Sequence, residues 1–342
     1  MTSGVRYPIG RAPRDWPAAR ARMADSHLGS AGWEGFTRSA PTIRAFNHLI
    51  AGTYFERRFG RWPISPRQPG ASINDYIFDR MIGDQWSARH RSFVDKDTAK
   101  REARRAVPGI RIAETLAVIP MRAIGSVNQL YECLQPFIGT DTIAKPAHSS
   151  GAATFLRGVR SPGDLRVLHD LASLDYAFCM REMQYLGLPR QIIVETLVPT
   201  ATGAPSDYKF HCVGGEPLLC QIDHARFGAP WSRLFRVPDF RAMDPDDGLV
   251  PPADFALPTA EQRASMIAAA RALAAPFDFV RVDLYLGADG IYFGELTFTP
   301  AASLGVAPAA AGDHAENSTH HIYSRIMMDA LAEIQQPAKR TG

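Results

Sequence analysis

The sequence has no apolar run close to the ~20 residues that a membrane-spanning helix needs, and its first residues lack the apolar segment of a signal peptide. Its four cysteines, Cys133, Cys179, Cys212 and Cys220, are scattered, which favours reduced thiols over a disulfide framework or a metal site. The net charge is only +3 and no lysine or arginine block stands out, which argues against nucleic acid as a partner. We therefore expect a cytoplasmic protein without a membrane span.

What the chain does have is the composition of a globular protein, with 46% apolar and 21% charged residues over 342 positions. Helical and strand-like segments follow one another in mixed order, which predicts an α+β fold with two sheets facing a shared cleft. Helices are expected over 42–59, 97–106, 126–137, 162–186, 259–277 and 318–335. Strands are expected over 110–118, 142–147, 153–159, 191–198, 207–214, 216–227, 279–286 and 291–298.

The most informative stretch is FVRVDLYLGADGIYFGELTF, Phe279 to Phe298, in which each of two apolar runs carries one acidic residue. A two-residue loop, Asp289-Gly290, would leave these two carboxylates on opposite faces of the hairpin. A three-residue loop, Ala288-Asp289-Gly290, would place glycine at the left-handed bulge position and pair Gly287 with Ile291. We expect the three-residue loop.

That register sets Asp283 opposite Glu295 and Arg281 opposite Thr297, with all four side chains on one face. Two carboxylates so close repel each other, so a cation is needed between them. A hard metal ion with oxygen ligands is the natural candidate.

Four segments, in this order along the chain, resemble the TupA-like ATP-grasp family, which is found with cell-surface polysaccharide genes. They are FVDKDTAKREARRAVPGIRIAETLAV, IAKPAHSSGAATFLRGV, IIVETLVP with SDYKFHCVGGEPLLCQIDHARF, and RVDLYLGADGIYFGELTF. The resemblance spans residues 72–313, and its specificity comes from the agreement of several spaced motifs. It implies an ATP-grasp fold, in which two α+β subdomains hold ATP between two antiparallel-rich sheets.

On this resemblance the chain divides into an N-terminal region that serves the substrate (1–90), a first ATP-grasp subdomain with the phosphate loop (91–187) and a second with the hinge and metal carboxylates (188–342). The resemblance also implies which residues contact ATP. These are Lys96 and Lys145 for the phosphates, the loop His148-Ser149-Ser150-Gly151, Glu195, Leu197 and Val198 around adenine, and Asp207 at the ribose.

The same resemblance makes Asp283 and Glu295 ligands of Mg2+. Thr297 stands where the wider superfamily usually has an asparagine ligand, so a second metal is not assured by the motif. Three cations, Lys209, Arg226 and Arg281, are candidates for steadying the transferred phosphoryl group or an acyl phosphate.

Several of these residues also have a purely structural interpretation. Asp283 or Glu295 could form a salt bridge with Arg281, and Glu195 could do the same elsewhere in a buried strand. Lys145 could be solvated after an ordinary turn, and Lys96 could belong to a surface Asp-Lys pair. Arg226 could be a solvated loop residue.

We therefore expect an ATP- and Mg2+-dependent carboxylate–amine ligase that forms ADP and acts in cell-surface polysaccharide or peptide-like biosynthesis. The resemblance suggests small molecules as partners, such as an acidic sugar and an amino acid. Two alternatives stay open: a small-molecule or sugar kinase on the same fold, and a nucleotide-binding module without catalysis in a polysaccharide-assembly complex.

Overall fold

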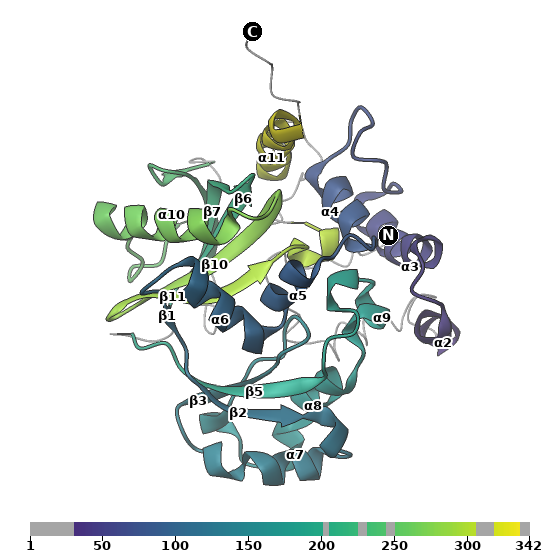
Figure 1. Ribbon diagram of the computed structural model, residues 1–342, viewed down its shortest axis with the longest axis vertical. Coiled ribbons are helices and arrows are strands. Elements are labelled where there is room, and N and C mark those ends of the chain that lie inside the picture. Colours follow the sequence, from purple (N-terminus) through teal and green to yellow (C-terminus); the bar gives the residue numbers. More distant parts are fainter. Residues whose placement is uncertain (1–30, 201–204, 225–230, 244–249, 306–317, 336–342) are drawn as a thin grey trace. The chain divides into compact units, whose positions relative to one another are not determined.

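The computed structural model describes residues 31–200, 205–224, 231–243, 250–305 and 318–335 (Figure 1). The chain forms two compact units, each assembled from separate stretches of sequence. Unit 1 contains residues 1–63, 80–98 and 113–197, and unit 2 contains residues 64–79, 99–112 and 198–342. The division into three consecutive parts stays a prediction.

Unit 1 is built on a four-stranded antiparallel sheet in the order β2-β5-β3-β4. Its strands are β2 (Thr115–Pro120), β3 (Thr142–Pro146), β4 (Thr154–Phe155) and β5 (Gln191–Thr196). The helices that begin in this unit are α2 (Ala31–Ser39), α3 (Arg44–Phe59), α5 (Ala88–Val94), α6 (Lys96–Ala106), α7 (Val127–Leu134), α8 (Arg166–Ser173) and α9 (Tyr176–Met180). Short 3-10 turns cover 121–123, 135–137, 156–158, 162–165 and 183–185.

One face of this sheet is apolar and lies against α7 and α8 (Figure 1). Leu130 and Leu134 from α7, Leu168 from α8, and Ala144 and Ile192 from the sheet are fully buried there. Burial alternates along β2, as expected for a strand with one face on the core.

Unit 2 contains a seven-stranded sheet in the order β1-β11-β10-β6-β7-β8-β9, antiparallel except for the β1–β11 pair. Its strands are β1 (Arg111–Ile112), β6 (Asp207–Val213), β7 (Glu216–His224), β8 (Trp231–Arg236), β9 (Arg241–Ala242), β10 (Phe279–Gly287) and β11 (Gly290–Thr297). Its helices are α4 (Ile73–Met81), α10 (Ala260–Ala274) and α11 (Thr319–Gln335), and a 3-10 turn covers 300–303.

Helix α10 contacts β6, β7 and β10 on one face of this sheet. It begins where the sequence predicted, after Thr259, which forms a capping box with Gln262. On the opposite face, Tyr76 of α4 and Tyr323 and Met327 of α11 pack with Phe279 of β10 in an apolar cluster. Because every residue of β6 is buried, the sheet is covered on both faces at its centre. Among the described residues, no helix is both long and apolar enough to cross a membrane.

Three of the predicted elements are wrong. The strand expected over 153–159 is a strand only at β4 and continues as a 3-10 turn over 156–158. The strand expected over 110–118 is two strands, β1 and β2, which belong to different sheets. The helix expected over 162–186 is broken into α8, α9 and two 3-10 turns, although no glycine or proline interrupts residues 164–186. Leu174 is extended and Arg181 is left-handed, with a φ of 58°.

The predicted helix is interrupted at Leu174 and again at Arg181. The interruption at Arg181 has a clear cause, because its guanidinium binds groups that are distant in sequence. Its Nη1 donates to Pro41 O and Asn47 Oδ1, both at 3.1 Å, and its Nη2 donates to Thr37 O at 2.5 Å and Ala40 O at 3.2 Å. The side chain is fully buried. It satisfies carbonyls at the end of α2, which otherwise lack partners within the helix.

Replacing Arg181 with lysine should lower the free energy of unfolding by about 2–4 kcal/mol, because one ammonium cannot replace a planar fork that serves four acceptors. Lysine has the same backbone preference, so the left-handed conformation at this position is not a further variable. Urea denaturation of the whole chain would measure the effect, with exposed Arg89→Lys in the same unit as the matched control. Equal midpoints for the two variants would show that Arg181 does not hold α2.

Candidate functional site

The β10–β11 hairpin places Asp283 opposite Glu295 and Arg281 opposite Thr297, as predicted. Directly opposed residues lie on the same face of a sheet, so the four side chains gather there. We call these four residues the hairpin cluster. The apolar contacts of α4 and α11 include Phe279, two residues before Arg281, and so cover the neighbouring part of the same face.

The turn that produces this register is not the one we predicted. Gly287 pairs with Gly290, which leaves a loop of two residues, Ala288 and Asp289. Continued without interruption, this pairing would set Asp283 opposite Gly294 and leave Glu295 on the other face of the hairpin. A β-bulge at Gly294 adds one residue to β11 and restores the pairing of the hairpin cluster. A Cβ atom at Gly294 would lie only 2.8 Å from the Asp283 carbonyl oxygen, so the bulge needs glycine.

The cation between the two carboxylates is the Arg281 guanidinium. Its Nε and Nη2 donate to the two oxygens of Asp283, both at 2.7 Å, in a bidentate pair. Nη2 also donates to Thr297 Oγ1 at 3.1 Å and lies 3.8 Å from Glu295 Oε1. Asp283 therefore forms a salt bridge with Arg281, and its role as a metal ligand stays a prediction.

The hairpin cluster supplies two carboxylates, the kind of ligand that Mg2+ prefers. Among the described residues, no group of three or more His, Cys, Asp or Glu side chains could hold a metal ion. Mg2+ is commonly held by one or two carboxylates together with substrate phosphates and water, so a larger protein cage is not required. The Glu295 side chain is 37% exposed and therefore accessible, whereas that of Asp283 is only 6% exposed.

In this cluster, burial and the neighbouring charges shift the pKa values of Asp283 and Arg281 in opposite directions. Burial raises the pKa of Asp283 to about 6, against the opposing effect of the Arg281 guanidinium. Burial alone would lower the pKa of Arg281, but the Asp283 carboxylate outweighs it and raises the pKa above its ordinary value. Arg281 is therefore charged, and Asp283 attracts a cation most strongly above about pH 6.

A second charged group lies on the same face, one strand further into the sheet. Lys209 Nζ is 2.8 Å from Asp207 Oδ2 and 2.6 Å from Asp223 Oδ2. Burial would lower the pKa of Lys209, but the Asp207, Asp223 and Asp283 carboxylates outweigh it and raise the pKa. Asp207, expected at the ribose, thus has one oxygen bound to Lys209.

A neutral pair links this face to α11. Tyr323 Oη lies 2.9 Å from His211 Nδ1, and His211 is the cross-strand neighbour of Arg281. Burial lowers the pKa of His211 well below its ordinary value, and the Arg281 and Lys209 charges act in the same direction. His211 is therefore neutral and holds the helix against the sheet.

In unit 1, the two expected phosphate lysines are both bound to other groups. Lys145 Nζ is 2.6 Å from Glu195 Oε2, in a pair whose carboxylate is 2% exposed and whose lysine is 24% exposed. Lys96 Nζ donates to Ser149 O at 2.5 Å, and its backbone N–H donates to Ala147 O at 3.1 Å. Lys96 therefore joins the start of α6 to the expected phosphate loop.

The loop itself has the backbone geometry of a tight, glycine-dependent turn. Gly151 and Ala152 have positive φ angles of 89° and 55°. His148 is buried, its Nδ1 accepts from Gln191 N at 3.3 Å, and burial lowers its pKa, so it is a neutral anchor of the loop. The Ser149 hydroxyl is buried and has no hydrogen-bond partner among the described residues. A ligand oxygen could accept a hydrogen bond from it.

Ser150 and three other sequence-predicted residues are less informative. The Ser150 side chain is hydrogen-bonded to the Tyr176 hydroxyl. Leu197 and Val198 directly follow β5 and are half-buried. Arg226 lies outside the described residues.

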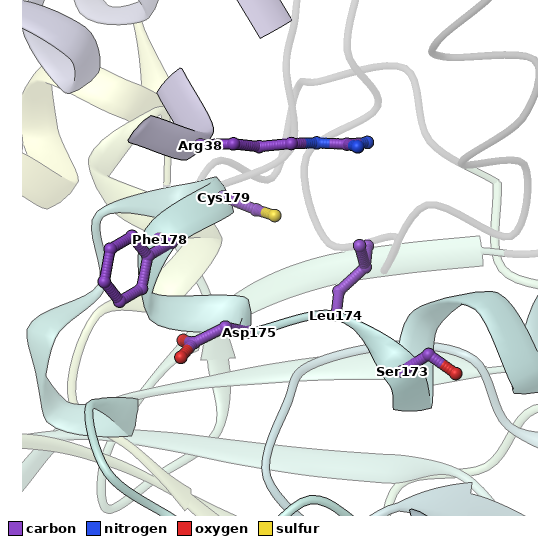
Figure 2. Close-up of a pocket in the computed structure, with 6 residues that line it drawn as sticks. All are labelled: Arg38, Ser173, Leu174, Asp175, Phe178 and Cys179. Carbon is purple, nitrogen blue, oxygen red and sulfur yellow. The ribbon is translucent and has the colours of Figure 1, made fainter. Parts of the chain in front are cut away.

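One pocket of about 330 Å³ opens in unit 1 (Figure 2). It is lined by Arg38, Ser173, Leu174, Asp175, Phe178 and Cys179. In Figure 2 the Arg38 side chain extends along one side of it and those of Cys179 and Leu174 project from α9 and the preceding segment. It contains none of the predicted site residues.

Comparison with known families identifies the class of protein to which this geometry belongs. A family model described as TupA-like ATPgrasp matches residues 124–308, more than half of the chain. The chain belongs to the TupA-like ATP-grasp family. The expected fold class, an α+β ATP-grasp fold with antiparallel-rich sheets, is confirmed by this membership and by the two sheets described above.

Similar solved structures are ligases by their own descriptions. The ATP-grasp ligase PsnB complexed with a minimal precursor is 12% identical, with 73% of this chain and 63% of that chain covered and a TM-score of 0.37. The VanG D-Ala:D-Ser ligase from Enterococcus faecalis is 15% identical, with 70% and 61% covered and a TM-score of 0.40. The chain thus spans less than two thirds of the length of either protein. No curated protein matches the sequence.

Sequence reasoning missed three residues of this face: Asp223, Gln221 and Ser232. Asp223 Oδ1 accepts from Ser232 Oγ at 2.5 Å and from Gln221 Nε2 at 2.8 Å. The alternation of Gln221 and Asp223 along β7, which matches that of Asp207 and Lys209 along β6, could have revealed them.

Gly294→Ala should lower the free energy of unfolding by about 1–3 kcal/mol, because the new methyl group meets backbone and the strand must shift. It should also disturb the pairing of Asp283 with Glu295. Urea denaturation measures the first effect, with Gly158→Ala as the control because a Cβ atom there meets nothing within 4 Å. If both variants unfolded at the same urea concentration, the bulge would not constrain the hairpin.

Proposed function

We propose that the chain is an ATP- and Mg2+-dependent carboxylate–amine ligase that forms ADP through an acyl phosphate. Membership of the ATP-grasp family supports the nucleotide and the reaction class. The observation that carries the proposal is the hairpin cluster, in which the Gly294 bulge keeps Asp283 and Glu295 opposed beside a bound arginine.

A carboxylate is a poor electrophile, because expelling oxide from it is not feasible at neutral pH. Phosphorylation turns that oxygen into a leaving group, and the amine can then displace phosphate from the acyl carbon. Asp283 and Glu295 would hold Mg2+, whose positive charge would offset the negative charge that develops on the transferring phosphoryl group. Cationic side chains of the protein would position the phosphoryl group and the substrate.

Arg281 is suited to steady an anionic oxygen, because its guanidinium is already oriented by Asp283 and Thr297 and needs little reorganisation. Thr297 also serves as an orienting acceptor for Arg281, which supports a single metal better than two. Lys209 is charged and donates to Asp207 and Asp223, and its third N–H, which has no acceptor among the described residues, can serve a substrate oxygen.

In unit 1, we propose that Lys96, Lys145 and the loop 148–151 bind the phosphates. Lys96 is bound to the loop carbonyl of Ser149, which presents the ammonium beside the loop, and the buried Ser149 hydroxyl is available. Glu195 and Lys145 form one ion pair, which supports a joint role at the nucleotide. Leu197 and Val198 would then lie along adenine.

The substrates are proposed only as classes, a small carboxylic acid and an amine, with an acidic sugar and an amino acid as the first choices from the family resemblance. Synthesis of a cell-surface polysaccharide or a peptide-like product would use such a ligase. A need for ATP supports the cytoplasm as its location.

With ATP, Mg2+ and the correct acid, but without an amine, hydroxylamine should trap a hydroxamate, and the nucleotide product should be ADP. A pairwise screen of acids and amines for ADP release would find the substrates. Asp283→Asn and Glu295→Gln keep size and shape and should each reduce turnover by at least about 10²-fold, the scale of a lost electrostatic contact in the transition state.

Two results would contradict the ligase assignment, and a third would contradict the role of the hairpin cluster. Formation of AMP and pyrophosphate would exclude an acyl phosphate route. A stable phosphorylated product that amines do not consume would establish a kinase. Full turnover in both Asp283→Asn and Glu295→Gln would remove the hairpin cluster from the chemistry.

A further inference from the structure

Lys209 does not pair with the carboxylate that lies directly opposite it. In the β6–β10 ladder Lys209 is the cross-strand partner of Asp283, and the two side chains are on one face. Opposite charges in such positions normally attract each other. Within the described part of the chain, however, no ion pair joins Lys209 to Asp283, and Lys209 Nζ is bound to Asp207 and Asp223 instead.

The alternative partners of Lys209 are themselves a cross-strand pair. Asp207 on β6 lies opposite Asp223 on β7, so two buried carboxylates face each other and need a cation between them. We call Asp207 and Asp223 the lysine clamp. Both of its members are at least nine-tenths buried, and so is Lys209.

The outer member of the clamp is fixed in place by neutral donors. Ser232 and Gln221 both donate to Asp223 Oδ1, at 2.5 Å and 2.8 Å. The other oxygen, Oδ2, is thereby directed to Lys209 at 2.6 Å. The position of the ammonium thus depends on contacts from β7 and β8, away from the hairpin cluster.

This arrangement separates two cations that would otherwise compete for one carboxylate. Both oxygens of Asp283 already accept hydrogen bonds from Arg281, one from Nε and one from Nη2. A second cation on the same carboxylate would oppose the binding of a divalent metal by charge repulsion. We propose that the lysine clamp withholds Lys209 from Asp283 and so keeps Asp283 available to a metal ion.

The proposal rests on the proposed function, because it takes Asp283 as a metal ligand. It gives Asp207 a task other than the ribose contact that the sequence suggested. Asp207 and Asp223 are then positioning residues, since they act on the metal site only through Lys209.

The test uses Mn2+ as the metal and the non-hydrolysable ATP analogue AMP-PNP as the nucleotide, with free Mn2+ measured by electron paramagnetic resonance. In Asp223→Asn, only Asp207 competes with Asp283 for Lys209, so the Kd for Mn2+ should rise about tenfold, the scale of one charge-assisted contact. Ser232→Ala keeps every charge but releases Asp223, and should raise the Kd about threefold. Asp239→Asn, which removes an exposed charge in the turn between β8 and β9, should change nothing.

A second substitution separates the clamp from a general structural role. Adding Lys209→Met to Asp223→Asn removes the competing ammonium, so Mn2+ affinity should return to within about twofold of the wild type. Circular dichroism would verify that each variant is folded. A change in Mn2+ affinity between variants that are all folded then reports on the metal site rather than on folding.

Two outcomes would overturn the clamp while leaving the proposed function intact: wild-type Mn2+ affinity in Asp223→Asn, or no recovery in the double variant. If wild-type protein bound neither AMP-PNP nor Mn2+, the proposed function would fail, and the clamp with it.

Discussion

The candidate site depends on one ion pair, the bidentate contact of Arg281 with Asp283, and on the bulge that places Glu295 and Thr297 beside it. Two carboxylates opposed on neighbouring strands repel each other unless a cation lies between them. Arg281 supplies that cation from the same strand as Asp283, two residues away, because residues i and i+2 share a face. A single glycine, Gly294, lets the strand shift so that all four side chains meet.

The same requirement recurs across the sheet. Lys209 compensates Asp207 and Asp223 in the way that Arg281 compensates Asp283. Removing one member of such a buried group leaves an uncompensated charge, which is costly, so these residues are mutually dependent. With Glu295, this group has four carboxylates for its two cations, Lys209 and Arg281, and a divalent metal would relieve that local excess of negative charge.

Much of the fold could be predicted from sequence because local signals were strong. The capping box at Thr259 and the apolar runs of β10 and β11 correspond to elements in the structure. The break of the helix expected over 162–186 could not be predicted, because Arg181 makes its contacts with residues about 140 positions away. Such contacts override local propensity.

The hairpin shows how a correct pairing can follow from a wrong turn. We predicted the opposition of Asp283 and Glu295 from a three-residue loop, whereas the structure uses a shorter loop and a bulge at Gly294. Predicting the lysine clamp requires the register of β10, β6 and β7, which the spacing of residues within one strand does not give. The motifs of the family, in contrast, pointed to the right fold because they combine distant segments.

The central claim is that the hairpin cluster holds a divalent metal together with the nucleotide. Calorimetric titration of AMP-PNP into wild-type protein and Asp283→Asn, each in Mg2+ and in EDTA, tests it most directly. We expect tight binding only for wild-type protein in Mg2+, with EDTA and the substitution each weakening affinity by about tenfold or more. Equal affinity in Mg2+ and EDTA for wild-type protein would contradict the account.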